Sequence, residues 1–208
     1  KADGQDRIEA VKPGDVISFT LESNLPQSLS AQVKRRTPNE DSPDDDRPYI
    51  IEKQSYQLVF HDEMSSNLSF NQATLKVEIM NNGKLVELPE KYYTVRTDLE
   101  GETFRVTVGL AAAFNDGQIS YDQLKNAAQI VVSYDATVKD SVINGDKVEN
   151  RAWVNDSEED IVDGPVIDPD VPSTGGVGTK AFTAAGIALM GVAAGAVIVT
   201  GKKKKEEQ

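Results

Sequence analysis

The sequence VISFTLE at residues 16–22 alternates apolar and polar side chains. In a strand, successive side chains point to opposite faces, so Ile17, Phe19 and Leu21 share one face while polar residues occupy the other. A turn sequence, PGD at residues 13–15, stands directly before it. The segment therefore predicts a strand with one buried face, which is typical of antiparallel sheets.

The same period of two recurs along the first three quarters of the chain, where it is more frequent than the helical period of 3.6. Alternating segments occur at residues 56–60, 75–80, 104–108, 130–138 and 148–154. Strands at such turn-separated intervals predict an all-β domain over residues 1–156, built as an antiparallel β-sandwich. One short helix is expected at residues 120–129, where Tyr121, Leu124 and Ala128 share a face.

Two polar residues interrupt the apolar faces of these strands. Asp62 continues the inward set of its strand, and Asn150 lies within the inward set of residues 148–154. Burying an amide without a partner costs about 2–7 kcal/mol, and an ionised carboxylate costs more. Both side chains therefore need partners, for example each other in a hydrogen-bonded pair, unless a β-bulge or a strand end turns them to solvent.

Charge divides the chain near residue 170. Residues 1–170 contain 17 basic and 32 acidic residues, whereas residues 171–208 contain five basic and two acidic residues. A polyanionic domain repels nucleic acid phosphates, so no nucleic-acid partner is expected. The chain has no Cys, which excludes disulfides, thiolate catalysis and Cys-based metal sites.

The sequence lacks the motifs of enzymes and metal sites. Residues 114–124 look like the second half of an EF-hand loop, but the full loop aligned on Gly117, residues 112–123, lacks three of the side-chain ligands. No nucleophile elbow, phosphate-binding loop or dinucleotide fingerprint occurs. We therefore predict a protein that is not an enzyme and that uses no cofactor or metal.

The C-terminal part has the organisation of a membrane-anchored tail. Residues 157–170 are acidic and contain proline, which predicts an extended linker. Residues 181–200 carry no charge, and as a helix at about 1.5 Å per residue they would reach about 30 Å, the hydrocarbon thickness of a bilayer. Lysines 202–205 follow them, so we expect a single transmembrane helix, with the basic tail, residues 201–208, in the cytoplasm and the acidic domain outside.

A five-residue motif precedes this helix: Val171, Pro172, Ser173, Thr174 and Gly175. The motif, the apolar span and the basic end together resemble a Gram-positive cell-wall sorting signal over residues 171–208. The family motif is L-P-x-T-G, and Val171 stands in place of its Leu. The resemblance implies that a sortase cleaves after Thr174 and joins it to a peptidoglycan precursor or to another subunit, after a transient stay in the membrane.

Four segments of the predicted domain resemble the isopeptide-forming D2-type domain of Gram-positive pilins and fimbrial subunits. They are Lys1 ahead of PGDVISF at 13–19, FHDEMSSNLSF at 60–70, IVVSYDAT at 130–137 and VENRAWV at 148–154. The resemblance implies an immunoglobulin-like, CnaA-like sandwich in which a lysine amine and an asparagine amide join with loss of ammonia, assisted by a buried acid. Matched residue by residue, it gives Lys1 and Asn150 as the cross-linked pair and Asp62 as the acid. Asn155, of opposite parity, is the weaker amide candidate.

Alternatives remain for the amine and the acid. Lys12 or Lys53 could supply the amine in place of Lys1. Glu63 would take the role of Asp62 if a bulge shifted the register of its strand.

These features predict a structural subunit of a pilus or fimbrium on the cell surface, with sortase, peptidoglycan and other pilin subunits as partners. The rival prediction is a wall-anchored adhesin module that binds a host ligand through exposed loops, among them the polar segment 37–48. Because an exterior domain needs export and no leader begins the chain, we expect the chain to be part of a longer precursor.

Overall fold

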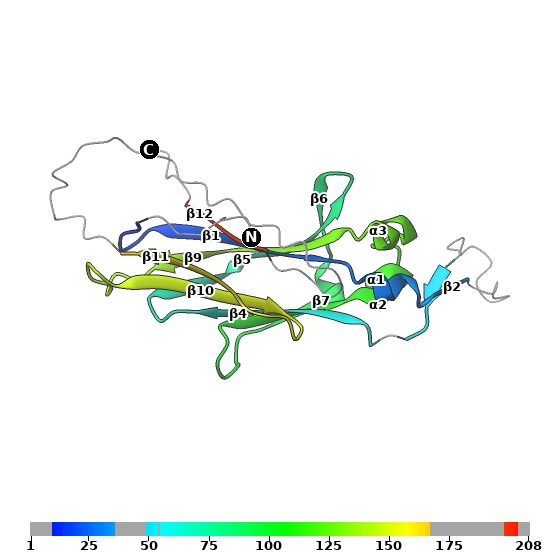
Figure 1. Ribbon diagram of the computed structural model, residues 1–208, viewed down its shortest axis with the longest axis horizontal. Helices are drawn as coiled ribbons and strands as arrows, with labels where there is room; N and C mark the ends of the chain where they lie inside the picture. Colours follow the sequence, from blue (N-terminus) through cyan, green and yellow to red (C-terminus); the bar gives the residue numbers. More distant parts are fainter. Residues whose placement is uncertain (1–9, 36–48, 54, 167–197, 204–208) are drawn as a thin grey trace.

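The computed structural model describes residues 10–35, 49–53, 55–166 and 198–203. These residues form two five-stranded antiparallel sheets that lie face to face, with a small two-stranded sheet at one end (Figure 1). The antiparallel β-sandwich that the alternating segments predict is therefore confirmed.

The first sheet has β9 at its centre. Its strand order is β12 (Ile198–Lys203), β1 (Val16–Asn24), β9 (Gln129–Val138), β5 (Leu68–Asn81) and β6 (Lys84–Glu87). β1 pairs with β9 over its whole length, and Phe19 lies opposite Tyr134. The pairing of β5 with β9 shifts register between Asn71 and Lys76. Phe19 and Tyr134 are both buried, so the centre of this sheet presents aromatic rings to the interior.

The second sheet has β4 at its centre. Its strand order is β11 (Asp160–Pro165), β10 (Lys147–Val154), β4 (Gln57–Met64), β8 (Phe104–Gly109) and β7 (Tyr93–Arg96). Asp62 on β4 lies opposite Ala152 on β10, and Asn150 lies opposite Met64. The two polar residues are therefore two positions apart on neighbouring strands.

The core lies between the two sheets, where alternation places one face of each strand. In β1 the buried apolar residues are Ile17, Phe19 and Leu21, as the sequence predicts. β8 and β10 alternate in the same way. β9 departs from strict alternation, because Val131 and Asp135 on its outward side are also buried.

Within the described residues, three short α-helices and a 3₁₀ helix connect the strands. They are α1 (Gln27–Ser30), η1 (Glu90–Tyr92), α2 (Leu110–Asn115) and α3 (Tyr121–Lys125). The α-helices gather at the end of the sandwich that carries the small sheet of β2 (Val33–Arg35) and β3 (Tyr49–Ile51) (Figure 1). The sequence predicts only α3, which is shorter than expected and begins with a capping box of Ser120 and Gln123.

The domain continues past the predicted boundary at residue 156. Asp160–Pro165 form β11, an edge strand paired with β10. Val162 is fully buried, although the acidic residues around it conceal this strand in the sequence. Pro165 is tolerated because an edge strand leaves one row of backbone groups without a strand partner. The prediction of a linker over residues 157–170 is therefore wrong for β11.

Of the C-terminal tail, the structure describes only β12. The VPSTG motif, residues 171–175, and most of the predicted transmembrane helix, residues 181–200, lie outside the described residues. β12 runs antiparallel to β1, so residues 198–200 are extended here rather than helical. Ile, Val and Thr are β-branched and favour extended backbone, and the edge of β1 supplies a pairing partner. Within the described ranges, no helix has the length and apolar character needed to cross a bilayer.

Candidate functional site

The two polar residues that alternation places inward meet in the interior. Asp62 on β4 and Asn150 on β10 are both fully buried. Asn150 Nδ2 donates a hydrogen bond to Asp62 Oδ2 at 2.9 Å. The strand register produces this contact, because residues offset by two positions on adjacent antiparallel strands share a face and lie within reach of each other.

A third side chain, Tyr134, joins this pair from the opposite sheet. Its hydroxyl donates to Asp62 Oδ2 and accepts a hydrogen bond from Asn150 Nδ2 at 2.8 Å. The sequence places Tyr134 among the inward residues of β9 but carries no signal for this contact, since the two sheets come together only in the folded protein. We refer to Asp62, Tyr134 and Asn150 as the polar cluster.

Two oxygen atoms of the polar cluster have no hydrogen-bond partner among the described residues. They are Asp62 Oδ1 and Asn150 Oδ1, and both are buried. Buried polar atoms are hydrogen-bonded in the great majority of cases. A charged lysine amine has three N–H donors and accepts no hydrogen bonds, so it could donate to both of these oxygen atoms.

Burial dominates the electrostatics of the polar cluster. Removal from water raises the pKa of Asp62 from 3.8 to about 7, although the hydrogen bonds from Tyr134 and Asn150 oppose this rise. Burial also raises the pKa of Tyr134 well above its ordinary value, and the neighbouring Asp62 acts in the same direction. Near neutral pH, Asp62 can therefore gain or lose a proton, whereas the Tyr134 hydroxyl keeps its own.

Aromatic rings from both sheets pack around the Tyr134 side of the polar cluster. The Tyr134 ring stacks on Phe19 with centroids 5.5 Å apart, and it meets Phe104 and Phe70 edge-on at 4.8 Å and 5.7 Å. Phe19 and Phe104 are fully buried. This packing holds the Tyr134 hydroxyl in one direction and keeps the surroundings of the polar cluster apolar.

The alternative acid and amide lie apart from the polar cluster. β4 pairs with both neighbours without a register shift, so Glu63 points away from the face that carries Asp62 and is only half-buried. Asn155 follows β10 with a positive φ of 51°, and its Oδ1 accepts a hydrogen bond from the backbone N–H of Val59 at 3.0 Å. The geometry therefore favours Asp62 and Asn150 over these two residues.

Of the candidate amines, Lys12 and Lys53 lie outside the polar cluster. Lys12 and Lys53 are exposed, and Lys53 Nζ lies 5.5 Å from the ring centroid of Tyr56. Lys1 lies outside the described residues, as do the motif residues 171–175 and the loop 37–48 of the adhesin alternative. The role of Lys1 stays a prediction.

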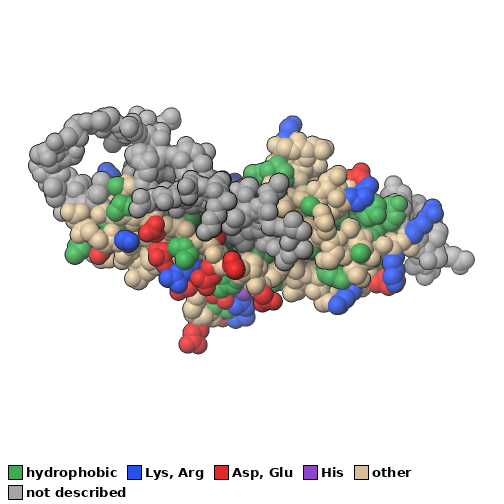
Figure 2. Space-filling model, viewed as in Figure 1, with side chains coloured by type: hydrophobic (Ala, Val, Ile, Leu, Met, Phe, Trp, Pro, Cys, Tyr) green, Lys and Arg blue, Asp and Glu red, His purple; other side chains and the backbone are tan. Residues whose placement is uncertain are grey.

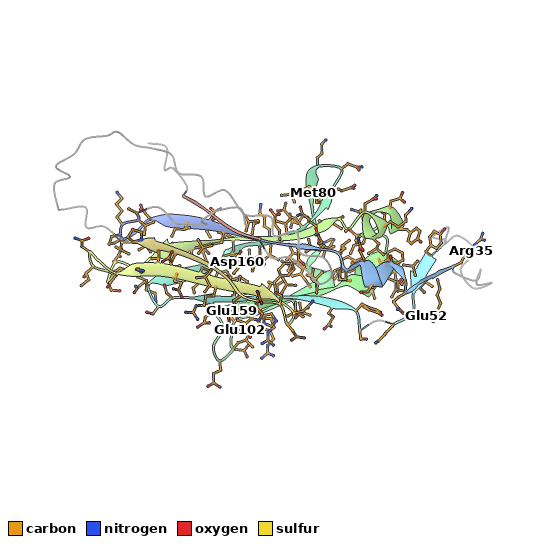
Figure 3. All side chains as sticks on the ribbon, in the orientation of Figure 1. Arg35, Glu52, Met80, Glu102, Glu159 and Asp160 are labelled. Carbon is orange, nitrogen blue, oxygen red and sulfur yellow. The ribbon has the colours of Figure 1, made fainter. Side chains whose placement is uncertain are left out.

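A second group of ionisable residues lies on the outer face of the second sheet. The His61 ring stacks on Trp153 with centroids 4.9 Å apart, and His61 Nδ1 lies 3.1 Å from Glu102 Oε2. Arg105 Nε donates to the same Glu102 oxygen at 3.1 Å. Burial would raise the pKa of Glu102, but the hydrogen bonds from Arg105 and His61 outweigh it and hold this pKa below its ordinary value. Glu102 lies below β4 in Figure 3, and Figure 2 shows acidic and basic side chains intermingled on this lower part of the molecule.

The C-terminal segment matches a known family model. Residues 172–208 match the LPXTG cell wall anchor motif. None of the curated proteins matches the chain in sequence. The chain therefore carries a cell-wall anchor motif over the segment that the sequence identifies as a sorting signal.

Several solved structures are similar to this chain in fold. The pilus backbone RrgB from Streptococcus pneumoniae is 18% identical over 74% of this chain and 45% of that chain, with a TM-score of 0.48. BcpA, the major pilin subunit of Bacillus cereus, is 15% identical over 78% of this chain and 37% of that chain, with a TM-score of 0.45. The collagen binding subdomain of the Enterococcus faecalis surface protein ACE is 11% identical over 76% of this chain and 93% of that chain, with a TM-score of 0.41. The chain thus spans less than half of the length of the two pilin chains.

Proposed function

We propose that the protein is a structural subunit of a Gram-positive pilus or fimbrium, attached to the cell wall by a sortase and locked by an internal isopeptide bond between Lys1 and Asn150. The observation that carries this proposal is the buried contact between Asp62 and Asn150. The anchor motif over residues 172–208 supports a place at the cell surface, with the precursor held in the membrane and its C-terminus in the cytoplasm.

The proposed reaction joins an amine to the side-chain amide of Asn150. The lysine nitrogen attacks Asn150 Cγ, the Cγ–Nδ2 bond breaks, and Nδ2 leaves as ammonia. One proton passes from the amine nitrogen to the leaving nitrogen, so the atoms balance without a co-reactant. Only a neutral amine attacks, and a dry interior favours the neutral form because burial lowers the pKa of a lysine.

Asp62 lies where it can move that proton. Its pKa of about 7 lets it take a proton from the lysine ammonium and give it up again. Asp62 Oδ2 lies 2.9 Å from Asn150 Nδ2, the atom that must gain a proton to leave. Well-oriented intramolecular reactions gain about 7–11 kcal/mol from placement alone. Folding supplies that placement, and the reaction happens once in each molecule.

The proposed bond would change the path of mechanical load. Lys1 precedes β1 of the first sheet, whereas Asn150 lies on β10 of the second sheet. Tension between Lys1 and an anchored Thr174 would pass through the bond and then along residues 150–174. The strands between residues 1 and 150 would lie off this path, and the bond would slow their unfolding.

The intact mass of the full 208-residue chain tests this proposal. We expect the mass of the parent chain to be lower than its sequence mass by one ammonia. Asn150→Ala should have its full sequence mass. Asn155→Ala is the matched control, because it removes an amide of the same segment outside the polar cluster and should keep the deficit. Lys1→Ala identifies the amine, since the deficit would persist in this variant if Lys12 or Lys53 reacted instead. A parent chain at its full sequence mass would refute the cross-link.

A further inference from the structure

We propose that Tyr134 is a positioning residue for the cross-linking reaction, an inference that rests on the proposed isopeptide bond. Its hydroxyl holds Asn150 Nδ2 beside Asp62 Oδ2, so the leaving nitrogen faces the proton carrier before the amine attacks. Nothing in the alternation of β9 distinguishes Tyr134 from the other inward residues of the strand. The inference comes from its contacts alone.

The direction of the hydrogen bonds determines the orientation of the amide. The Tyr134 hydroxyl has one proton, and it donates this proton to Asp62 Oδ2. Towards Asn150 it can then only accept, so it must face the amide NH₂ and not the amide oxygen. The same NH₂ also donates to Asp62 Oδ2 at 2.9 Å. The amide nitrogen is thereby held by two acceptors, while Asn150 Oδ1 has no hydrogen-bond partner among the described residues.

The hydroxyl comes from a strand other than the two that carry Asp62 and Asn150. Tyr134 belongs to the central strand of the first sheet, while Asp62 and Asn150 belong to the second. Its ring is packed against Phe19 and Phe104, which are fully buried. Tyr134→Phe would keep this packing and remove only the hydroxyl, so the contribution of the hydroxyl can be measured separately from that of the ring.

Loss of the hydroxyl should have two separable effects. Asn150 Nδ2 would lose one of its two acceptors, so the amide could rotate and turn its nitrogen away from Asp62. Asp62 would also lose a donor that lowers its pKa, so this pKa would rise. The reaction needs one proton shared between Asp62 and the amine. When both groups are protonated, Asp62 cannot take the proton from the ammonium, and the reaction stops. The acid limb of the rate profile therefore follows the Asp62 pKa and should move to higher pH.

Refolding of the full chain tests this inference. The chain is recovered unfolded and without the cross-link, refolded at roughly pH 5 to 9, and sampled by intact mass to give a rate of ammonia loss at each pH. We expect Tyr134→Phe to react about tenfold more slowly at the pH optimum, the factor for one hydrogen bond, and to show an acid limb at higher pH. Tyr92→Phe is the matched control, since Tyr92 is a buried tyrosine whose hydroxyl donates to Asp116 Oδ2 at 2.8 Å outside the polar cluster. It should match the parent in rate and in pH profile.

The outcomes separate this inference from the proposed function. If the parent loses ammonia and Tyr134→Phe matches it in rate and acid limb, the positioning role is wrong while the cross-link stands. If the parent loses no ammonia at any pH, both are wrong. Should Tyr134→Phe fail to fold, Tyr134→3-fluorotyrosine is used as the second variant. It keeps the ring, and its hydroxyl is a stronger hydrogen-bond donor. Its acid limb should move to lower pH, and an acid limb at the parent's pH would overturn the inference.

Discussion

An uncross-linked chain should become less stable as the pH rises from about 4 to about 7, because of Asp62. In Lys1→Ala the proposed amine is absent, so the buried carboxyl keeps its pKa of about 7, whereas in the unfolded chain it returns to its ordinary value of 3.8. Between these values the folded chain holds a proton that the unfolded chain has released. The free energy of unfolding therefore falls as the pH rises through this interval and becomes constant above it.

The difference between the folded and unfolded pKa values of Asp62 determines how much the free energy of unfolding changes. The pKa of Asp62 is 3.8 in the unfolded chain and about 7 in the folded chain. At about 1.36 kcal/mol for each pKa unit, this difference corresponds to about 4 kcal/mol of unfolding free energy. Domains of this kind have a total stability of about 5–15 kcal/mol, so the loss should be large enough to measure directly.

Urea unfolding followed by the fluorescence of Trp153, the only Trp of the chain, measures this free energy from roughly pH 4 to 9. The control carries Asp62→Asn in addition to Lys1→Ala, because an amide of the same shape does not titrate. The difference between the two variants removes the effect of other carboxyls, such as Glu22, whose pKa is also raised by burial. A difference that stays constant across the whole range would refute the raised pKa of Asp62 and its proposed role in moving the proton.

Two further substitutions test the contacts of Glu102 on the outer face of the second sheet and the anchor motif. Glu102→Gln removes the carboxylate shared by His61 and Arg105, and we expect it to lower the free energy of unfolding by about 1–3 kcal/mol at neutral pH. Because the pKa of Glu102 is lowered in the folded chain, this difference should disappear as the pH falls through that pKa, and equal stabilities at neutral pH would contradict it. Thr174→Ala should abolish retention on wall fragments after detergent extraction, while Ser173→Ala, at the variable position of the motif, should keep it. A Thr174→Ala chain that stays bound to wall fragments would exclude sortase attachment at this residue.

The sequence predicts much of the sandwich because side-chain alternation is a local property of an extended backbone. It also identifies Asp62 and Asn150, since a polar residue in an apolar face is visible in the pattern itself. The prediction fails at β11, where Val162 is buried but its strand lies at a sheet edge among acidic residues. Edge strands bury fewer side chains than central ones, so their periodicity is weaker.

The amino-acid sequence by itself determined which side chains of the strongly alternating strands face the interior and where the anchor motif lies, because both depend only on residues close together in the chain. The tertiary structure alone decided that Tyr134 meets Asp62 and Asn150. Tyr134 and Asp62 are 72 positions apart and belong to different sheets. Their contact depends on how the two sheets pack face to face, and the period of neither strand carries that information.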